Sequence, residues 1–547
     1  MKYDDAQRVN GVGGGWRGRV LLGIGLAITL CGVACRDVAE APADGRLAGL
    51  SDYIRSAMAD WDLPGLAVAV VHADEVIFAE GFGVKELGRE DQVDAHTLFQ
   101  IGSVSKSFGA AAIGALVDDG LVRWDDPVVE HLPWFRVKDP EITREMTIRD
   151  LLSHQSGMPG VVFPALTIMD ARTAAERVRH LDNRTPLKEF RYSNQGYGVA
   201  GLVVEAVTGK TWSEWVRERL LRPLDMHNSA ASPYELWEDP FVAPTFLGTA
   251  PAGAVGIADA PDRNVAMPHG VDREGARRVL AWQSYDSMQA AGSVVSSAAE
   301  LANWLRMHLA RGRFGDRAVL GAATVEEMHA PQVASGATFL FADDLTSGTY
   351  GLGWHRTTFE GHPYLSHGGG MFGFPAYVAL LPDIAAGVVV LGNGDAWFHP
   401  HHEITAWVFA RLLGVEPRDW HGESMAHKAA IVAQAESNLA AQDSARVPGT
   451  RPTLPLDEYV GSYAEPLGAG HAEVVLAQDG RLRLHFGEPG TFSGELEHWN
   501  DDVFRLYFDG GDGQTDRSSF ATFTVEPEIG VTIMDLGSMG QYRRREG

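Results

Sequence analysis

The chain has 547 residues, 45% of them hydrophobic and 22% charged, which is more than one domain needs and enough to form large buried cores. Its 72 acidic and 46 basic residues give a formal net charge of −26, which argues against nucleic acid as a partner. The same composition excludes a chain that is disordered throughout.

The N-terminal segment has the pattern of an export signal. Arg17 and Arg19 precede an apolar run over residues 20–30, which has the length of a signal-peptide core and is too short for a comfortable membrane span. We therefore predict a signal peptide over residues 1–35, followed by a short tether over residues 36–45.

Both cysteines of the chain, Cys31 and Cys35, lie in this segment, so the sequence offers no disulfide framework for the rest of the protein. The four residues that end at Cys35 resemble a bacterial lipobox, with Gly32 where that motif prefers leucine. This resemblance implies lipidation of Cys35.

The first elements predicted after the tether are a helix and a hairpin. Apolar residues at helical spacing predict the helix over 46–61, and two β-rich runs, 66–72 and 76–82, predict the hairpin. Further along, residues 230–275 are rich in Pro, Gly and Ala without periodicity, which is typical of a lid or an irregular insertion.

Ser103 and Lys106 stand three residues apart at the head of an Ala-rich helical run, so their side chains share a helix face. A serine hydroxyl needs a base to become a nucleophile, and a lysine in a dry cleft can lose its proton and serve as that base. The helix N-terminus adds N–H groups that can stabilise an oxyanion. The structural alternative makes Ser103 an N-cap and Lys106 a solvated residue of the first turn.

Two later motifs favour the catalytic interpretation. Tyr192, Ser193 and Asn194 precede a helix predicted over 196–221, and His367 is followed by three glycines between two strand-like runs. Between these motifs and Ser103, a helix and loop carry His154. A histidine at a helix end in a Gly/Ser loop is more often structural than catalytic.

Taken in this order, the S-x-x-K, Y-x-N and His-Gly-Gly-Gly motifs resemble the serine β-lactamase and penicillin-binding-protein superfamily, specifically its class C β-lactamase-like branch of esterases and peptidases. The resemblance covers residues 46–420. It implies an α/β fold with an antiparallel sheet flanked by helices and a helical subdomain, and it implies no cofactor. The Leu-Leu-x-His-x-Ser-Gly stretch around His154 is a hallmark of that branch outside its catalytic groups.

The resemblance also implies a role for each motif residue. Ser103 would attack the carbonyl carbon to form an acyl-enzyme, and Lys106 would accept its proton. Tyr192 would relay a proton to the leaving group, and Asn194 would position the acyl side through its amide. The backbone N–H groups of Ser103 and Gly370 would form the oxyanion hole.

His367 marks a departure from class C β-lactamases, which have Lys-Thr-Gly at this place. A neutral imidazole cannot supply the cation that grips a β-lactam carboxylate, so the resemblance favours cleavage of small esters or of peptides that contain D-amino acids. His367 would line the wall of the site, where it can hold the Tyr192 hydroxyl or a substrate carboxylate. Gly368 and Gly369 would let a substrate backbone lie against the strand.

Two alternatives to this function stay open. One is a β-lactamase or a penicillin-binding DD-peptidase, which would use the same nucleophile. The other is a non-catalytic cell-wall-binding or sensor protein.

A cluster of His399, His401, His402 and Glu403 raises the question of a metal ion. Consecutive side chains on a helix point to different faces, an arrangement that suits one shared ion poorly. We predict a solvated turn and no metal site.

The C-terminal part changes character. Residues 421–455 are an Ala-rich helical connector and a Pro-rich linker, and residues 456–547 contain short strands of period two with Gly/Asp turns. They predict a small all-β barrel that resembles the lipocalin-like accessory domain of some members of the branch.

The expected protein is therefore exported, periplasmic or extracellular. It would act on a small-molecule or peptide substrate and contact a membrane only through an N-terminal lipid anchor. The sequence leaves the oligomeric state open.

Overall fold

The computed structural model describes residues 45–545 except 159–169, 181–186, 237–263, 272–275, 281, 283, 338–346, 372, 395–399, 417, 465–470, 487–491, 509–518 and 538–539. The predicted signal peptide, the tether and both cysteines lie outside the described residues, as does most of the segment 230–275. No described helix is both long enough and apolar enough to span a bilayer.

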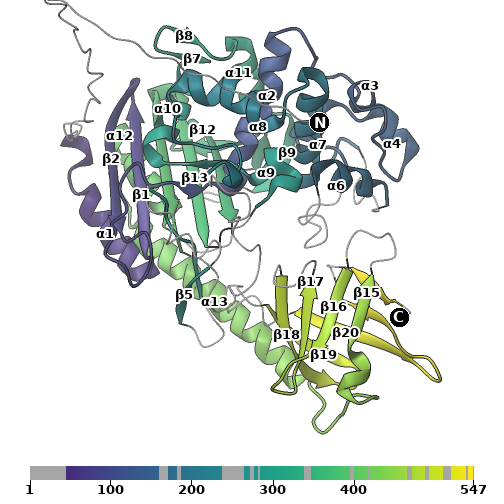
Figure 1. Cartoon of the computed structure of the whole chain (residues 1–547). Helices are drawn as coiled ribbons and strands as arrows, with labels where there is room; N and C mark the ends of the chain where they lie inside the picture. The colour runs from purple at the N-terminus through teal and green to yellow at the C-terminus, as the bar shows by residue number, and fades with distance from the viewer. Residues whose placement is uncertain are drawn as a thin grey trace, which may run out of the picture. The chain divides into compact units, whose positions relative to one another are not determined.

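An antiparallel sheet of eight strands organises the larger part of the chain, in the order β2-β1-β14-β13-β12-β11-β10-β9 (Figure 1). The strands are β1 (Gly65–His72), β2 (Glu75–Gly83), β9 (Val333–Ala337), β10 (Ser347–Tyr350), β11 (His355–Phe359), β12 (His362–Met371), β13 (Phe374–Leu381) and β14 (Ala386–Gly392). The predicted N-terminal hairpin is confirmed as β1 and β2.

Helices cover both faces of this sheet. In β1, Leu66, Val68 and Val70 belong to one apolar core, and the alternate residues Ala67 and Ala69 belong to the other, as a strand buried on both faces requires. One core includes residues of α1 (Leu50–Trp61) and α12 (His401–Leu413), and the other includes residues of α2 (Ser105–Asp118), α7 (Asn194–Thr208) and α10 (Ala298–Leu309).

Short elements complete the helical part. The helices are α3 (Val128–His131), α4 (Pro140–Glu145), α5 (Ile148–Leu152), α6 (Ala171–Arg177), α8 (Trp212–Val216), α9 (Gln289–Gly292) and α11 (Ala322–His329), with a 3₁₀ turn η2 (Gly102–Val104). The paired short strands are β3 (Phe99–Gln100) with β6 (Val295–Ser296), β4 (His269–Val271) with β5 (Arg277–Val279), and β7 (Arg313–Phe314) with β8 (Arg317–Ala318).

The helix predicted over 196–221 is interrupted. Gly209 ends α7 in the left-handed region with φ 69°, and Thr211 starts α8 with a capping box that includes Glu214. These end signals outweigh the apolar periodicity that continues across them.

The C-terminal residues form a closed eight-stranded antiparallel barrel after the long helix α13 (Trp420–Ser444). Its strands are β15 (Gly461–Ala464), β16 (His471–Leu476), β17 (Leu482–Phe486), β18 (Phe492–Asn500), β19 (Val503–Phe508), β20 (Ser519–Glu526), β21 (Gly530–Asp535) and β22 (Gln541–Arg544). The predicted barrel is confirmed. Buried aromatic rings such as Tyr459, Tyr463 and Phe523 fill its core.

The prediction of a solvated turn at the histidine cluster is wrong. His401 and Glu403 are fully buried because they begin α12, which packs on the sheet. His401 lies 3.3 Å from the carbonyl oxygen of Pro375, and Glu403 lies 3.0 Å from His421, so the two side chains do face different neighbours. His399 is outside the described residues.

Candidate active site

Ser103 and Lys106 meet at the N-terminus of α2. Ser103 lies in the turn η2, and Nζ of Lys106 is 3.0 Å from its Oγ and donates a hydrogen bond to the carbonyl oxygen of Ala291 at 2.9 Å. Lys106 is fully buried, and this burial lowers its pKa well below the usual value. The structural alternative fails, because Lys106 is not solvated and Val104, not Ser103, occupies the N-cap of α2.

Tyr192 completes this group. Its hydroxyl shares a hydrogen bond with Ser103, and its ring centroid is 4.7 Å from Nζ of Lys106. Burial raises the pKa of Tyr192, although the hydrogen bond to Ser103 lowers it, so the phenol stays protonated at neutral pH. The first two sequence motifs therefore meet at one hydroxyl group.

Asn194 is the first residue of α7, and Ser193 caps that helix through a hydrogen bond from the Gly196 N–H. The Nδ2 of Asn194 donates to the hydroxyl of Tyr285 at 3.3 Å. The Oδ1 of Asn194 is buried without a hydrogen-bond partner in the described part of the chain. Sequence reasoning missed Tyr285, which follows an aperiodic segment with no motif of its own.

Strand β12 runs directly against the turn that holds Ser103. A Cβ atom on Gly369 would collide with the carbonyl oxygen of Ile101 and lie 3.0 Å from the amide nitrogen of Ser103. A Cβ on Gly102, whose φ is 49°, would lie 2.7 Å from the amide nitrogen of Gly370. The two N–H groups expected to form an oxyanion hole thus come from two backbone segments in close contact.

One side of β12 is open beyond Ser366. The pairing between β11 and β12 ends there, at His355 and Ser366, while β13 continues to pair with β12 as far as Met371. Gly368 and Gly370 are exposed along this stretch. A Cβ on Gly368 would make only an ordinary contact, 3.6 Å from the Tyr377 ring, so packing does not require glycine there.

His367 has both ring nitrogens engaged. Nδ1 lies 2.7 Å from the carbonyl oxygen of Gly368, which can only accept, so Nδ1 carries the proton and Nε2 accepts from the Tyr350 hydroxyl at 3.0 Å. Burial, helped by His355 and Lys106, lowers the pKa of His367 well below its usual value. The ring is therefore neutral, and its nitrogens contact Tyr350 and Gly368 rather than the Tyr192 hydroxyl.

Two further aromatic side chains near His367, Tyr350 and His355, belong to no motif that the sequence analysis identified. Tyr350 is fully buried, with its ring centroid 4.7 Å from the rings of both His154 and His355. Burial lowers the pKa of His355 to about 4. Within the described ranges, no three His, Cys, Asp or Glu residues are arranged to hold a metal ion. The contact of Tyr350 with His355 depends on the pairing of β10 with β11, which local spacing does not reveal.

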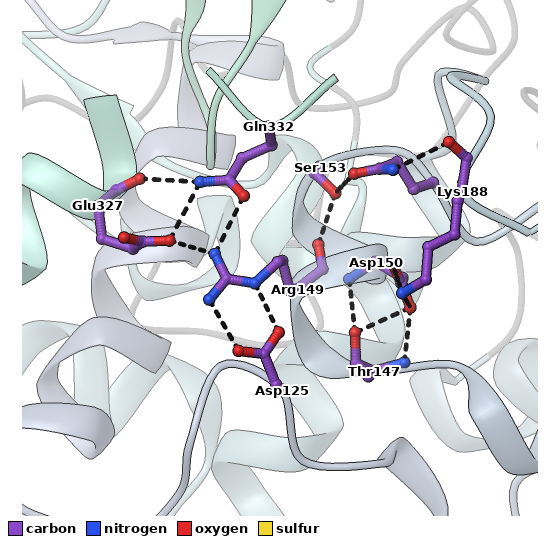
Figure 2. A network of polar contacts seen from close by, with 9 residues as sticks. Asp125, Thr147, Arg149, Asp150, Ser153, Lys188, Glu327 and Gln332 are labelled. Carbon is purple, nitrogen blue, oxygen red and sulfur yellow. Dashed lines mark hydrogen bonds and ion pairs between the residues drawn. The ribbon is translucent and has the colours of Figure 1, made fainter. Parts of the chain in front are cut away.

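A network of polar contacts surrounds helix α5, as Figure 2 shows. Arg149 makes two hydrogen bonds to Asp125, at 2.6 and 3.0 Å, one to Gln332 at 3.0 Å, and one to Glu327. The backbone N–H of Gln332 donates to the carbonyl oxygen of Tyr350 at 2.9 Å. Arg149 thus links α5 to the strand that carries Tyr350.

Comparisons with known proteins agree with this geometry. The family described as Beta-lactamase matches residues 50–411, and a domain of unknown function, DUF3471, matches residues 445–542. Unguisins hydrolase ungD of Aspergillus violaceofuscus is 28% identical over 450 residues, 77% of this chain and 75% of that protein. Penicillin-binding protein 4 of Amycolatopsis lactamdurans is 30% identical over 366 residues, 64% of this chain and 87% of that protein.

Solved structures share the fold. The octameric penicillin-binding protein homologue from Pyrococcus abyssi matches with a TM-score of 0.57 at 22% identity, and SurE matches with a TM-score of 0.53 at 23% identity. Each match covers 91% of this chain and 99% of the other.

Proposed function

Because the chain belongs to the Beta-lactamase family, whose members are serine hydrolases, we propose that it cleaves ester or amide bonds through an acyl-enzyme on Ser103. The observation that supports this most is the buried Lys106 amine, 3.0 Å from the Ser103 hydroxyl. Its lowered pKa favours the neutral amine, which can accept the serine proton at neutral pH.

The proposed reaction has two halves. In the first, Ser103 Oγ attacks the substrate carbonyl, its proton passes to Lys106, and the N–H groups of Ser103 and Gly370 stabilise the oxyanion. Tyr192, which stays protonated, gives its proton to the leaving group and is reprotonated from Lys106. In the second, water attacks the acyl group with the same residues acting in reverse, while Asn194 holds the acyl side.

For the substrate we propose small esters or peptides that contain D-amino acids. The open side of β12 beside Gly368 and Gly370 supports a peptide-like substrate, because an extended backbone can pair with it. The neutral His367 supplies no cation for a β-lactam carboxylate. The relative named as an unguisins hydrolase supports hydrolysis more broadly.

A second candidate is a penicillin-binding DD-peptidase, which the 30% identity to penicillin-binding protein 4 favours. A non-catalytic wall-binding or sensor protein is the weaker third, because such a protein has no need for a buried lysine against a serine hydroxyl.

The other expectations from the sequence stay proposals. They are a signal peptide over 1–35, lipidation of Cys35, export, and a division into a hydrolase domain over 46–420, a connector over 421–455 and a lipocalin-like accessory domain over 456–547.

Labelling with a fluorophosphonate tests the central proposal. The probe should modify wild-type protein on Ser103, as located by peptide mass spectrometry, and should not modify Ser103→Ala. Ser107, whose buried hydroxyl donates to the Val104 carbonyl, supplies the matched control, since Ser107→Ala should still be labelled. A label on any other residue, or none on wild type, contradicts the proposal. Short-chain esters, D-alanyl peptides and a chromogenic β-lactam then rank the substrate classes.

A further inference from the structure

A single buried histidine holds the backbone on both sides of Tyr192. The N–H of Arg191 donates to the carbonyl oxygen of His154 at 2.7 Å, and the N–H of Ser193 donates to its Nδ1 at 3.0 Å. The two rings lie against each other, with centroids 4.2 Å apart. His154 is fully buried and has no place in the reaction described above.

The conformation of His154 makes this double contact possible. Its φ is 61°, in the left-handed region that residues other than glycine seldom adopt. It follows Ser153, the C-cap of α5, so the chain turns sharply where the helix ends. This turn places both the carbonyl group and the imidazole of His154 against one segment of the chain, residues 187–193, which we call the strap.

A second set of bonds fixes the same strap. The N–H of Lys188 donates to the carbonyl oxygen of Gln155, and the Gln155 side-chain amide donates to the carbonyl oxygen of Lys188, both at 2.9 Å. Nζ of Lys188 lies 2.7 Å from both carboxylate oxygens of Asp150, as Figure 2 shows. These bonds attach the segment that carries Tyr192 to the end of α5.

The protonation state of His154 agrees with this contact. Nδ1 can accept from a peptide N–H only when it carries no proton. Burial, with smaller effects from Lys106 and His367, lowers the pKa of His154 well below its usual value, so the ring is neutral. The neutral ring can therefore accept the Ser193 N–H at its Nδ1.

We propose that His154 is a positioning residue for Tyr192: it fixes the peptide units on both sides of that tyrosine and so keeps the phenol hydroxyl on Ser103. It contacts no reacting atom. This inference depends on the proposed function, because it gives Tyr192 the task of protonating the leaving group. A histidine that only filled the core would stabilise the fold without affecting that proton transfer in particular.

The test is a double-mutant cycle of His154→Leu and Tyr192→Phe, measured with esters of graded leaving-group pKa. His154→Leu should lower kcat/KM, which reports acylation alone, about 10- to 100-fold for poor leaving groups and about threefold or less for p-nitrophenyl esters, whose leaving group needs no proton. In the Tyr192→Phe background, His154→Leu should lower kcat/KM about twofold or less, because the Tyr192 hydroxyl that His154 positions is already absent.

His154→Asn and His154→Gln give a test that does not need the leucine variant to fold. The Oδ1 of asparagine can take the place of Nδ1, and asparagine tolerates positive φ, so His154→Asn should recover most of the kcat/KM for poor leaving groups. The amide of glutamine lies one carbon further from the backbone, so kcat/KM for poor leaving groups should stay low in His154→Gln. Equal rates in these two variants, with equal melting temperatures, overturn the inference.

Acyl-enzyme formation by wild type separates failure of the His154 inference from failure of the proposed function. If wild type forms an acyl-enzyme but the two losses multiply in the cycle, or His154→Leu affects all leaving groups alike, His154 does not act through Tyr192. If wild type forms no acyl-enzyme, the proposed function fails first and the inference fails with it.

Discussion

The hydroxyl of Tyr350 lies 3.0 Å from Nε2 of His367 and comes from a different strand of the sheet. Because the Nδ1 proton is directed to the Gly368 carbonyl, the tyrosine must donate to the remaining lone pair. The imidazole is thus held in one tautomer and one orientation at the wall of the site, with no nitrogen left over for a substrate.

Replacement of Tyr350 by phenylalanine should release that lone pair. A hydrogen bond to the neutral form of an imidazole disfavours protonation, so the pKa of His367 should rise in Tyr350→Phe, while the Gly368 carbonyl keeps the proton of the neutral ring on Nδ1. Imidazole ¹⁵N chemical shifts report the change in pKa and the loss of the hydrogen bond to Nε2. Tyr364→Phe is the matched control, since it removes a buried hydroxyl that contacts Tyr377 rather than a histidine. Unaltered His367 shifts in Tyr350→Phe would contradict this reading.

The pH dependence of kcat/KM should reflect the buried base. Lys106 must be unprotonated to accept the serine proton, so the rate falls only as pH drops below its pKa, which burial holds well below 10.5. Burial raises the pKa of Tyr192 above 10, which leaves no alkaline decline below that value. On a neutral ester the profile should therefore reach its plateau well below pH 10.5 and stay flat to about pH 10. A rate that climbs up to pH 10 would show that Lys106 is protonated at rest.

Gly369 and Gly368 should respond differently to alanine. Gly369→Ala brings a methyl group into the Ile101 carbonyl, and the overpacking should cost about 1–3 kcal/mol in the free energy of unfolding and distort the Ser103 turn. Gly368→Ala has room, so its stability should change by about 0.5 kcal/mol or less, while kcat/KM falls for peptides that lie along the open side of β12. Urea unfolding and peptide kinetics separate the two effects. Equal stabilities would mean that β12 adjusts without cost.

His421 should make stability depend on pH. It lies 3.0 Å from the buried Glu403 and 2.9 Å from Asp60, and hydrogen bonds to these two carboxylates raise its pKa against the opposing effect of its burial. A raised pKa stabilises the fold below the unfolded value of about 6.5, and this contribution disappears as pH rises through the folded pKa. His421→Gln should lose about 1 kcal/mol at pH 5.5 and less at pH 9.

His362→Gln supplies the control for that comparison, because His362 contacts Asp383 at an exposed site. Denaturant unfolding of both variants at the two pH values checks the sign. A deficit of His421→Gln that grew with pH would contradict the assignment.

Local signals in the sequence predicted part of the site. Ser103 and Lys106 meet because one helix turn separates them, and Tyr192 and Asn194 flank a helix start that a serine caps. Their neighbours could not be predicted in the same way. Tyr350 reaches His367 only through the order of the sheet strands, and His154 holds Tyr192 through a backbone turn for which the sequence offers no glycine.

The same distinction applies to the fold. The N-terminal hairpin consists of two β-rich runs joined by a short turn, and the strands of the C-terminal barrel alternate with period two. Both pair strands that are neighbours in the sequence, so local composition, periodicity and turn residues were sufficient to predict them. Burial of His401 and Glu403 was not predictable, because polar residues at a helix start are ordinarily exposed and only the packing of α12 on β13 and β14 decides otherwise.

The pairing of β1 with β14 has a consequence for how the chain acquires this fold. Leu66 opposes Gly392 and His72 opposes Ala386, so the N-terminal hairpin, at one edge of the sheet, joins the other strands only through a strand that is synthesised more than 300 residues later. Closing so long a loop costs chain entropy before any contact repays it, which slows folding. A nascent chain that stops short of β14 contains Ser103, Lys106 and Tyr192 but lacks the strand that completes the sheet. Catalytic competence should therefore appear late and all at once, after residue 392 has been made.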